Sequence, residues 1–278
     1  MTIDILRDKT DMMETTRSWQ AAGDPVCLVP TMGCIHTGHL ALIEKAREIA
    51  ARAVVSIYVN PTQFSPNEDF DSYPRRFDAD CATIRAAGAD AIYAPADMYG
   101  DNHATMVVPA GVALPMEGET RPHFFTGVAT VVYKLFTHVP ADHAIFGEKD
   151  FQQLAVIRQM VRDMDMPIDI ISHPTIRESD GLALSSRNHY LTPQQRGIAP
   201  TLYAAMRAAA VALMSGTAID QVLDQAKATL ISAGFDRIDY FDLRSANDLQ
   251  PSRHPTSTDR LFAAVWLGQT RLIDNCQL

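Results

Sequence analysis

The order of apolar and polar residues predicts alternating helices and strands over roughly the first 170 residues. Residues 53–59 read Ala-Val-Val-Ser-Ile-Tyr-Val, a continuous β-branched run that is typical of a strand buried on both faces. The predicted helices span 10–22, 39–52, 77–87, 128–138 and 150–164, and the predicted strands span 26–29, 53–59, 91–94, 142–146 and 168–171. This repeated strand-helix-strand order predicts an α/β fold with a mostly parallel sheet and helices on both faces.

The pattern changes after about Pro174. A helix is expected from Thr192 to about Met214, because Thr192-Pro193-Gln194-Gln195 combines a capping box with proline at the first helical position. The remaining predicted elements are a helix at 219–233 and strands at 238–243, 261–267 and 271–273. Two helices and a small sheet predict a smaller α+β domain of roughly 100 residues. We therefore expect one domain at 1–174 and a second at 175–278.

Composition narrows the class of protein. The chain has 278 residues, of which 47% are hydrophobic, so it has enough apolar residues for a sizeable core. No apolar run approaches the roughly 20 residues of a membrane span, and the first residues lack the basic and then apolar pattern of a signal peptide. The four cysteines show no paired spacing, and 24 basic residues stand against 33 acidic ones. We expect a cytoplasmic protein without a membrane or nucleic-acid partner.

The segment Met32–His39 carries the most informative chemistry. It follows an apolar strand, contains Gly33 and Gly38, and opens an amphipathic helix. Backbone N–H groups at a helix start are unpaired and the helix dipole is positive there, so the pair His36 and His39 indicates an anion site, most simply for nucleotide phosphate. The pair has two alternatives, capping of the helix and lining of a cleft. A zinc site is disfavoured, because no thiolate or carboxylate stands at ligand spacing.

Cys34, in the same turn, has two interpretations. It is either a nucleophile or a small residue that fills a tight turn. The second is favoured, because no base is implied at a fixed position relative to the thiol. A separate cluster, Asn60 and Gln63, follows the strand at 53–59 and offers bidentate hydrogen-bonding groups for a small polar substrate. An ordinary Asn-Pro turn explains the same residues equally well.

Two further segments point to phosphate. Lys149 stands at a predicted helix start, where the helix dipole disfavours a cation, so it makes sense if it faces an anion. Asp150 fits an N-cap of that helix, and Gln153 lies nearly one turn further on. The segment Ser179–Asn188 contains a glycine, two adjacent serines and an arginine, and is suited to close over a polyphosphate. A solvated lysine and a plain surface loop are the alternatives.

Four motifs in register resemble those of the pantoate–β-alanine ligases, also called pantothenate synthetases. They are Pro-Thr-Met-Gly with His-x-Gly-His, Val-Ser-Ile-Tyr-Val-Asn-Pro-x-Gln-Phe, Phe-Gly-Glu-Lys-Asp-Phe-Gln-Gln-Leu and Asp-Gly-Leu-Ala-Leu-Ser-Ser-Arg-Asn. The resemblance runs on to the closing Trp-Leu-Gly and Arg271–Asn275. It implies a Rossmann-like nucleotidylyltransferase domain that binds ATP and pantoate, followed by a C-terminal α+β lid domain.

The activity implied by this resemblance is ATP-dependent condensation of (R)-pantoate with β-alanine through a pantoyl adenylate. ATP is the co-substrate, Mg²⁺ accompanies it, and a homodimer is expected, with the apolar segment 104–112 as a candidate subunit contact. The resemblance assigns proton donation to His39, with His36 and Lys149 as the other catalytic residues. The implied ATP-binding residues are Met32, Gly33, His36, Gly38, His39, Gly147, Glu148, Lys149, Asp150, Ile176, Leu184, Ser185, Ser186 and Arg187. Pantoate and β-alanine are expected at Gln63, Gln153 and Asn60.

One segment departs from the family pattern, which commonly reads Arg-Pro-Gly-His-Phe-x-Gly-Val. This chain has Phe124 at the usual histidine position, and His123 is displaced by one residue. Two other functions fit parts of the same evidence. One is nucleotidyl transfer to a phosphorylated acceptor, and the other is nucleotide binding without catalysis.

Overall fold

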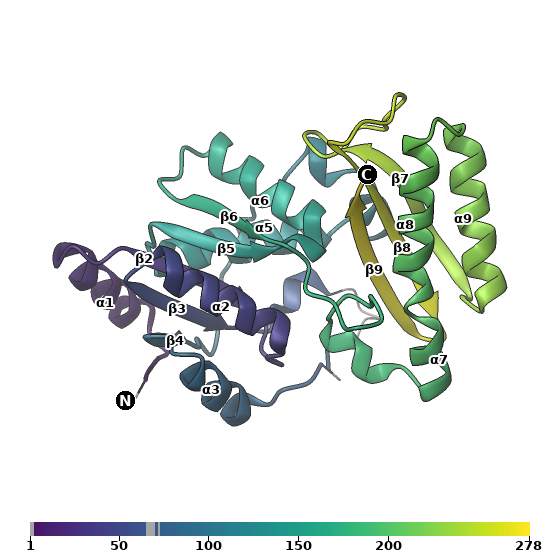
Figure 1. Ribbon diagram of the computed structural model, residues 1–278. Helices are drawn as coiled ribbons and strands as arrows, with labels where there is room; N and C mark the ends of the chain where they lie inside the picture. The colour runs from purple at the N-terminus through teal and green to yellow at the C-terminus, as the bar shows by residue number, and fades with distance from the viewer. Residues whose placement is uncertain (1–2, 65–69, 72) are drawn as a thin grey trace. The chain divides into compact units, whose positions relative to one another are not determined.

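The structure, a computed structural model, describes residues 3–64, 70–71 and 73–278. The chain forms two compact units (Figure 1). Unit 1 consists of Met1–Glu148 and Gln153–Pro174, and unit 2 consists of Lys149–Gln152 and Thr175–Leu278. The expected division at residue 174 differs from these units by four residues, because Lys149–Gln152 belong to unit 2.

Unit 1 is built on a parallel six-stranded sheet with the order β1-β4-β3-β2-β5-β6. Its strands are β1 (Asp4–Leu6), β2 (Val26–Thr31), β3 (Arg52–Ile57), β4 (Ala91–Tyr93), β5 (His143–Gly147) and β6 (Asp169–His173). The chain moves outward from β2 to β3 and β4, and then returns to place β5 on the other side of β2. Open α/β sheets bind ligands at the carboxyl ends of strands where the order reverses, which here is between β2 and β5.

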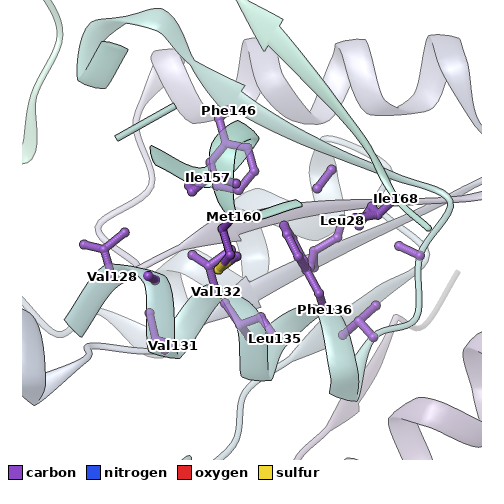
Figure 2. Packing of buried hydrophobic residues seen from close by; sticks show 14 of the residues in the cluster. Leu28, Val128, Val131, Val132, Leu135, Phe136, Phe146, Ile157, Met160 and Ile168 are labelled. Atoms are coloured by element: carbon purple, nitrogen blue, oxygen red, sulfur yellow. The ribbon is translucent and has the colours of Figure 1, made fainter. Parts of the chain in front are cut away.

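Alternate residues of the central strands face two separate cores. Val26 and Leu28 of β2 belong to one hydrophobic cluster, whereas Cys27 and Val29 belong to another. Figure 2 shows part of the first, in which the side chains supplied by helix α5 (Phe124–His138) include Val128, Val131, Val132, Leu135 and Phe136. Burial on both faces is the physical reason why the strands are continuous apolar runs.

The helical segments between these strands are α1 (Lys9–Ala21), α2 (Thr37–Ile49), η1 (Pro61–Gln63), α3 (Phe77–Ala86), η2 (Gly111–Ala113), α4 (Glu117–Thr120), α5 (Phe124–His138), η3 (Glu148–Asp150) and α6 (Phe151–Asp163). The η segments are single 3₁₀ turns. Two of them carry residues predicted for the site. η1 begins four residues after the end of β3, and η3 directly follows β5.

Unit 2 is an antiparallel sheet, in the order β7-β8-β9, with helices and its own core. Its elements are η4 (Ser186–Tyr190), α7 (Pro193–Ile198), α8 (Thr201–Met214), α9 (Ile219–Ala233), β7 (Arg237–Ser245), β8 (Asp259–Leu267) and β9 (Thr270–Gln277). Its hydrophobic cluster includes Leu202 and Met206 of α8, Leu230 of α9 and Phe241 of β7. The predicted fold class, a mostly parallel α/β domain with a small C-terminal α+β domain, is confirmed.

Two predicted elements were wrong in detail, and one strand was missed. The single helix expected up to Met214 is two helices, because Pro200 has no N–H to donate and α7 stops at Ile198. The last strand was expected at 271–273 and runs over Thr270–Gln277. The short strand β1 was not predicted at all. The capping box at Thr192 is present, with Thr192 and Gln195 bonding each other's backbone amides.

Among the described residues, one stretch, Pro193–Met214, is long and apolar enough to cross a membrane by length and composition alone. No apolar run of that length was expected from the sequence. One side of α8 packs into the core of unit 2 through residues that include Leu202, Ala205 and Met206. The opposite side of α8 is exposed at Val211.

Candidate active site

The loop between β2 and α2 is shaped by two residues with left-handed backbones. Gly33 has a φ of +82° and Cys34 a φ of 52°. A Cβ built on Gly33 would lie 2.9 Å from Oδ2 of Asp80, so a side chain there would be both strained and crowded. The Thr31 hydroxyl donates to the carbonyl of Ser56 (2.7 Å) and accepts from the amide of Gly33 (3.1 Å). The turn is therefore fixed before the helix begins.

His36 and His39 cap the first turn of α2. Nδ1 of His36 accepts from the amide of Gly38 at 3.1 Å, and Nδ1 of His39 accepts from the amide of His36 at 3.4 Å. The two rings are stacked, with centroids 4.0 Å apart and an interplanar angle of 27°. A neutral imidazole that accepts at Nδ1 carries its proton on Nε2, so each ring has an Nε2–H donor. The cap that sequence analysis treated as an alternative is present, and it selects the tautomer suited to donate to a phosphate oxygen.

Asp80, from helix α3, anchors the same turn. Its side chain is buried, with Oδ2 accepting from the amide of Cys34 and Oδ1 from the amide of Ile35, each at 2.8 Å. Hydrogen bonds to a carboxylate are roughly twice as strong as neutral ones. This residue was not predicted, because it lies 46 positions after Cys34 and acidic residues are common in the first turn of a helix.

Cys34 fits the role of a turn filler. Its side chain is 5% exposed, and burial, followed by the negative charge of Asp80, raises the pKa of its thiol. The thiolate is the nucleophilic form of cysteine, so both effects oppose nucleophilic chemistry. All four cysteines of the chain are buried and free.

Asn60 is the hub of a hydrogen-bonded cluster at the end of β3. Its side chain is 1% exposed. Nδ2 donates to Oε1 of Gln63 (3.1 Å) and to the carbonyl of Gly127 (3.2 Å), while Oδ1 accepts from the hydroxyls of Tyr99 (2.6 Å) and Thr62 (3.0 Å). These bonds use both donors and both lone pairs of the amide. Asn60 therefore orients Gln63, and its own amide is fully engaged within the protein.

Gln63 connects this cluster to the turn after β2. Its Nε2 donates to the sulfur of Met32 at 3.0 Å, and its backbone carbonyl accepts from the Arg121 guanidinium at 3.1 Å. Gly127 permits the close approach of α5 to η1, because a Cβ there would lie 2.4 Å from the carbonyl of Thr62. Three residues predicted for the site, Met32, Asn60 and Gln63, are thus in one bonded group.

Phe124, at the position where the family commonly has histidine, is the first residue of α5. Its ring lies under the Arg121 guanidinium, whose central carbon is 3.9 Å from the ring centroid. Arg121 also pairs with the buried carboxylate of Glu117, at 3.4 Å. His123 precedes the helix, is exposed and makes no side-chain cap. The aromatic ring of Phe124 therefore supports the arginine that bonds to the Gln63 backbone.

The segment after β5 divides between the two units. Gly147 ends the strand and Glu148 begins η3, both in unit 1, whereas Lys149 and Asp150 belong to unit 2. The Lys149 ammonium is 3.7 Å from the Asp150 carboxylate, and its side chain is 20% exposed. Asp150, expected as the N-cap of the following helix, is the last residue of η3 and directly precedes α6. Gln153 lies in the first turn of α6.

The serine and arginine loop begins in a short hairpin of unit 2. The amide of Leu184 donates to the carbonyl of Ile176 at 3.0 Å, and Arg177 and Ala183 form a β-bridge. Ser185 then caps η4, its hydroxyl accepting from the amide of Arg187 at 3.2 Å. Ser186 and Arg187 are the first residues of that turn. Hydrogen bonds from both backbone and side chains within the segment therefore define the path of the loop.

No group of three or more His, Cys, Asp and Glu side chains suited to hold a metal occurs in the part of the chain that the structure describes.

A parallel α/β sheet, with a glycine turn and a histidine-capped helix at the point where its strand order reverses, defines a nucleotide-binding α/β protein. The model of the family described as pantoate-beta-alanine ligase matches residues 4–277, and the chain belongs to that family.

Similar proteins match nearly the whole length of the chain. It is 48% identical over 276 residues to a pantothenate synthetase of Caulobacter vibrioides, covering 98% of this chain and 97% of that protein. It is 50% identical over 273 residues to a pantothenate synthetase of Rhizorhabdus wittichii, covering 98% of this chain and 97% of that protein. The crystal structure of pantothenate synthetase from Thermus thermophilus superposes with a TM-score of 0.92, at 40% identity and 99% coverage of both chains.

A further solved structure is a complex with ligands. It is a pantoate-beta-alanine ligase from Francisella tularensis complexed with beta-gamma ATP and beta-alanine. It superposes with a TM-score of 0.81 at 31% identity, covering 99% of this chain and 98% of that one. These matches do not favour the alternative of nucleotidyl transfer to a phosphorylated acceptor.

Proposed function

We propose that the chain joins (R)-pantoate to β-alanine at the expense of ATP, releasing AMP and diphosphate. The observation that carries the chemistry is the stacked histidine pair, whose Nδ1 atoms are used by the helix cap, so that protons reside on Nε2. Family membership, and the complex of the Francisella relative with beta-gamma ATP and beta-alanine, support the choice of substrates.

In the first step a carboxylate oxygen of pantoate attacks the α-phosphorus of ATP. A new P–O bond forms, the bond from the α-phosphorus to the bridging oxygen breaks, and diphosphate leaves with the electron pair. His39 and His36 donate to oxygens that gain charge at the reacting phosphate, and the segment Met32–Gly38 holds the nucleotide. Fixed donors of this kind stabilise developing charge because they need no reorganisation during reaction.

The departing diphosphate is assigned to groups of unit 2. Lys149 supplies a cation and Ser185, Ser186 and Arg187 supply further donors, while Ile176 and Leu184 complete the nucleotide site. Gly147, Glu148 and Asp150 are the backbone and side-chain neighbours of that lysine. Unit 2 acts in this proposal as the lid of the nucleotide site.

In the second step the neutral amine of β-alanine attacks the carbonyl carbon of pantoyl adenylate. A C–N bond forms, the acyl–phosphate C–O bond breaks, AMP leaves and the amine loses a proton. Gln63 and Gln153 hold pantoate, with Asn60 fixing the Gln63 amide. Mg²⁺ is proposed to be bound through ATP oxygens, and it would neutralise their charge.

The test is exchange of radiolabelled diphosphate into ATP by the purified protein. Exchange that requires pantoate, followed by pantothenate formation on addition of β-alanine, is the expected result. Exchange that is indifferent to pantoate contradicts the proposal. Binding of ATP, seen as a thermal shift, without any diphosphate release would favour a nucleotide-binding protein without catalysis.

We also propose a cytoplasmic homodimer that contacts itself through residues 104–112. Four buried free cysteines suit a reducing compartment. Within the segment, Val108 is 73% and Met106 38% exposed, and the amide of Val107 is held by the Thr130 hydroxyl at 2.9 Å. An exposed apolar segment of this kind is suited to pack against a copy of itself.

Val108→Glu is expected to convert the dimer to a monomer, measured by light scattering after size exclusion. Val211→Glu is the matched control, because Val211 is 61% exposed on α8 of unit 2. A dimer that survives Val108→Glu would remove this segment as the contact.

A further inference from the structure

The closing motif Arg271–Asn275 has no role in the mechanism above, yet two of its residues are among the most buried polar groups of unit 2. Asp274 is 5% and Asn275 3% exposed, and both lie in β9. Adjacent residues of a strand point to opposite faces. The two side chains therefore have different partners. Those of Asn275 lead to Lys149, and those of Asp274 lead to the Ser185–Arg187 loop.

Asn275 holds the backbone of Lys149. Its Nδ2 donates to the Lys149 carbonyl at 2.9 Å, across 126 positions of the chain. Its Oδ1 accepts from the guanidinium of Arg260, which is itself 9% exposed. That guanidinium also lies 4.2 Å from the centre of the Phe151 ring, two residues after the lysine. The Lys149 backbone is thus bonded to β9 through Asn275, and the nearby Phe151 ring contacts Arg260 of β8.

Asp274 holds the hairpin that leads to the serine and arginine loop. Its carboxylate accepts two hydrogen bonds from Arg177, at 2.6 and 2.8 Å. Arg177 also donates to the carbonyls of Gly181 (3.1 Å) and Asn275 (3.2 Å), and its guanidinium lies 3.6 Å from the Tyr203 ring centre. A bidentate arginine–carboxylate pair fixes orientation as well as distance.

We propose that Asp274 and Asn275 form one anchor in β9 that sets the position of Lys149 relative to the Ser185–Arg187 loop. They are positioning residues for formation of the adenylate. The inference rests on the proposed role of Lys149 and the loop on the phosphates of ATP.

The physical argument concerns the step in which diphosphate leaves. A cation and a set of donors stabilise that group only if both are placed before reaction, and a misplacement of about 1 Å can cost as much as 10²-fold in rate. Attack of β-alanine on the adenylate involves no triphosphate. The anchor therefore acts on the first half-reaction and leaves the second unchanged.

The first experiment compares the two half-reactions in Asn275→Asp. This variant keeps the size of the side chain and an acceptor for Arg260, but it turns an oxygen toward the Lys149 carbonyl in place of a donor. We expect diphosphate exchange to fall about 10-fold or more. Conversion of supplied pantoyl adenylate and β-alanine to pantothenate is expected to stay within about twofold of the parent. An equal fall in both half-reactions would overturn the inference.

Cys276→Ala is the matched control, because it changes the next buried residue of the same strand without touching a hydrogen bond of the anchor. Both half-reactions should be retained in this variant. If Asn275→Asp does not fold, Asp274→Asn provides the same comparison through Arg177. A loss of exchange in Cys276→Ala equal to that in the anchor variants would show general strand damage and contradict the inference.

The second experiment is a double-mutant cycle with Lys149→Ala. If Asn275 acts through Lys149, Asn275→Asp should reduce exchange by less than about twofold once the lysine side chain is gone. A full effect in that background would overturn the inference. Normal exchange by Lys149→Ala alone would instead contradict the proposed function, so the two failures are distinguishable.

Discussion

The histidine pair of unit 1 and the lysine of unit 2 are held in opposite ways. Each histidine ring accepts from a backbone amide two or three residues away, so the helix start is largely self-contained. The carbonyl of Lys149 accepts from Asn275, 126 positions later. The histidine cap is local and is visible as a sequence motif. The hydrogen bond to Lys149 forms only once the sheet of unit 2 has formed.

The largest expected effect on the rate follows from changing the histidine cap. His39→Ala and His39→Gln should each lower the rate of adenylation by at least ~10²-fold, as for loss of a transition-state donor. They should differ in stability, because glutamine at this helix position can still accept from the His36 amide and alanine cannot. Single-turnover rates and urea unfolding measure the two effects. Near-normal rates in His39→Gln would mean that the His39 imidazole caps the helix and has no catalytic role.

The next effect tests how far the turn depends on a distant group. Asp80→Asn places an N–H donor against a backbone amide, so we expect a loss of about 1–3 kcal/mol in the free energy of unfolding and a fall of roughly 10-fold in exchange. Asp78→Asn is the control, since Asp78 lies exposed in the same first turn of α3. If both variants behave alike, the carboxylate of Asp80 does not position the turn.

A smaller effect is expected at the contact between α5 and η1. Gly127→Ala should displace the Thr62 carbonyl and with it Asn60 and Gln63, at a cost of about 1–3 kcal/mol in stability. The KM for pantoate should rise while the KM for ATP changes little. Gly197→Ala is the control, because a Cβ there meets nothing within 4 Å. An unchanged KM for pantoate in Gly127→Ala would separate the amide cluster from substrate binding.

The last prediction concerns stability rather than catalysis. Burial, with the positive charges of Lys134 and Lys9, lowers the pKa of His138 to about 4, against the partly opposing charge of Asp8. A base whose pKa falls on folding binds fewer protons in the native state. Unit 1 should therefore lose stability as the pH falls from 6.5 toward 4, by about 3 kcal/mol from this group.

His138→Gln should reduce that slope, because an amide does not titrate and can still bond to the Tyr93 hydroxyl, now 2.7 Å from Nδ1 of His138. Urea unfolding at several pH values measures the slope. Trp19 reports on α1 of unit 1 and Trp266 on β8 of unit 2, so Trp266→Phe leaves a reporter of unit 1 alone. An unchanged slope would mean that folding does not lower the pKa of His138.

The sequence predicted what local patterns determine. The continuous apolar strands gave the parallel sheet, and the spacing of His36 and His39 after a glycine turn gave the helix start, although the shared cap was treated as an alternative to function. The fold class followed from such runs, and the family from the four motifs in register. Pro200 was visible in the chain, and its effect on the long helix could have been predicted from the missing N–H.

Contacts between residues far apart in the chain could not be predicted from local sequence patterns. Nothing near Asp80 or Asn275 in the chain indicates that one bonds to the amides after Gly33 and the other to Lys149. Asn60 was predicted as a substrate neighbour from its residue type, and only the structure shows that Thr62, Tyr99, Gly127 and Gln63 already use its amide. Side-chain function of this kind depends on tertiary packing.

The four residues Lys149–Gln152 lie between two stretches of unit 1 in the chain and yet fold with unit 2. No single cut of the polypeptide can therefore separate the units cleanly. An N-terminal fragment that ends at Pro174 would carry the lysine away from Asn275, and a C-terminal fragment would contain the anchor without its target. Recombination of such fragments would need this short stretch to find its place again, so recovery of activity in fragment complementation would report directly on its docking.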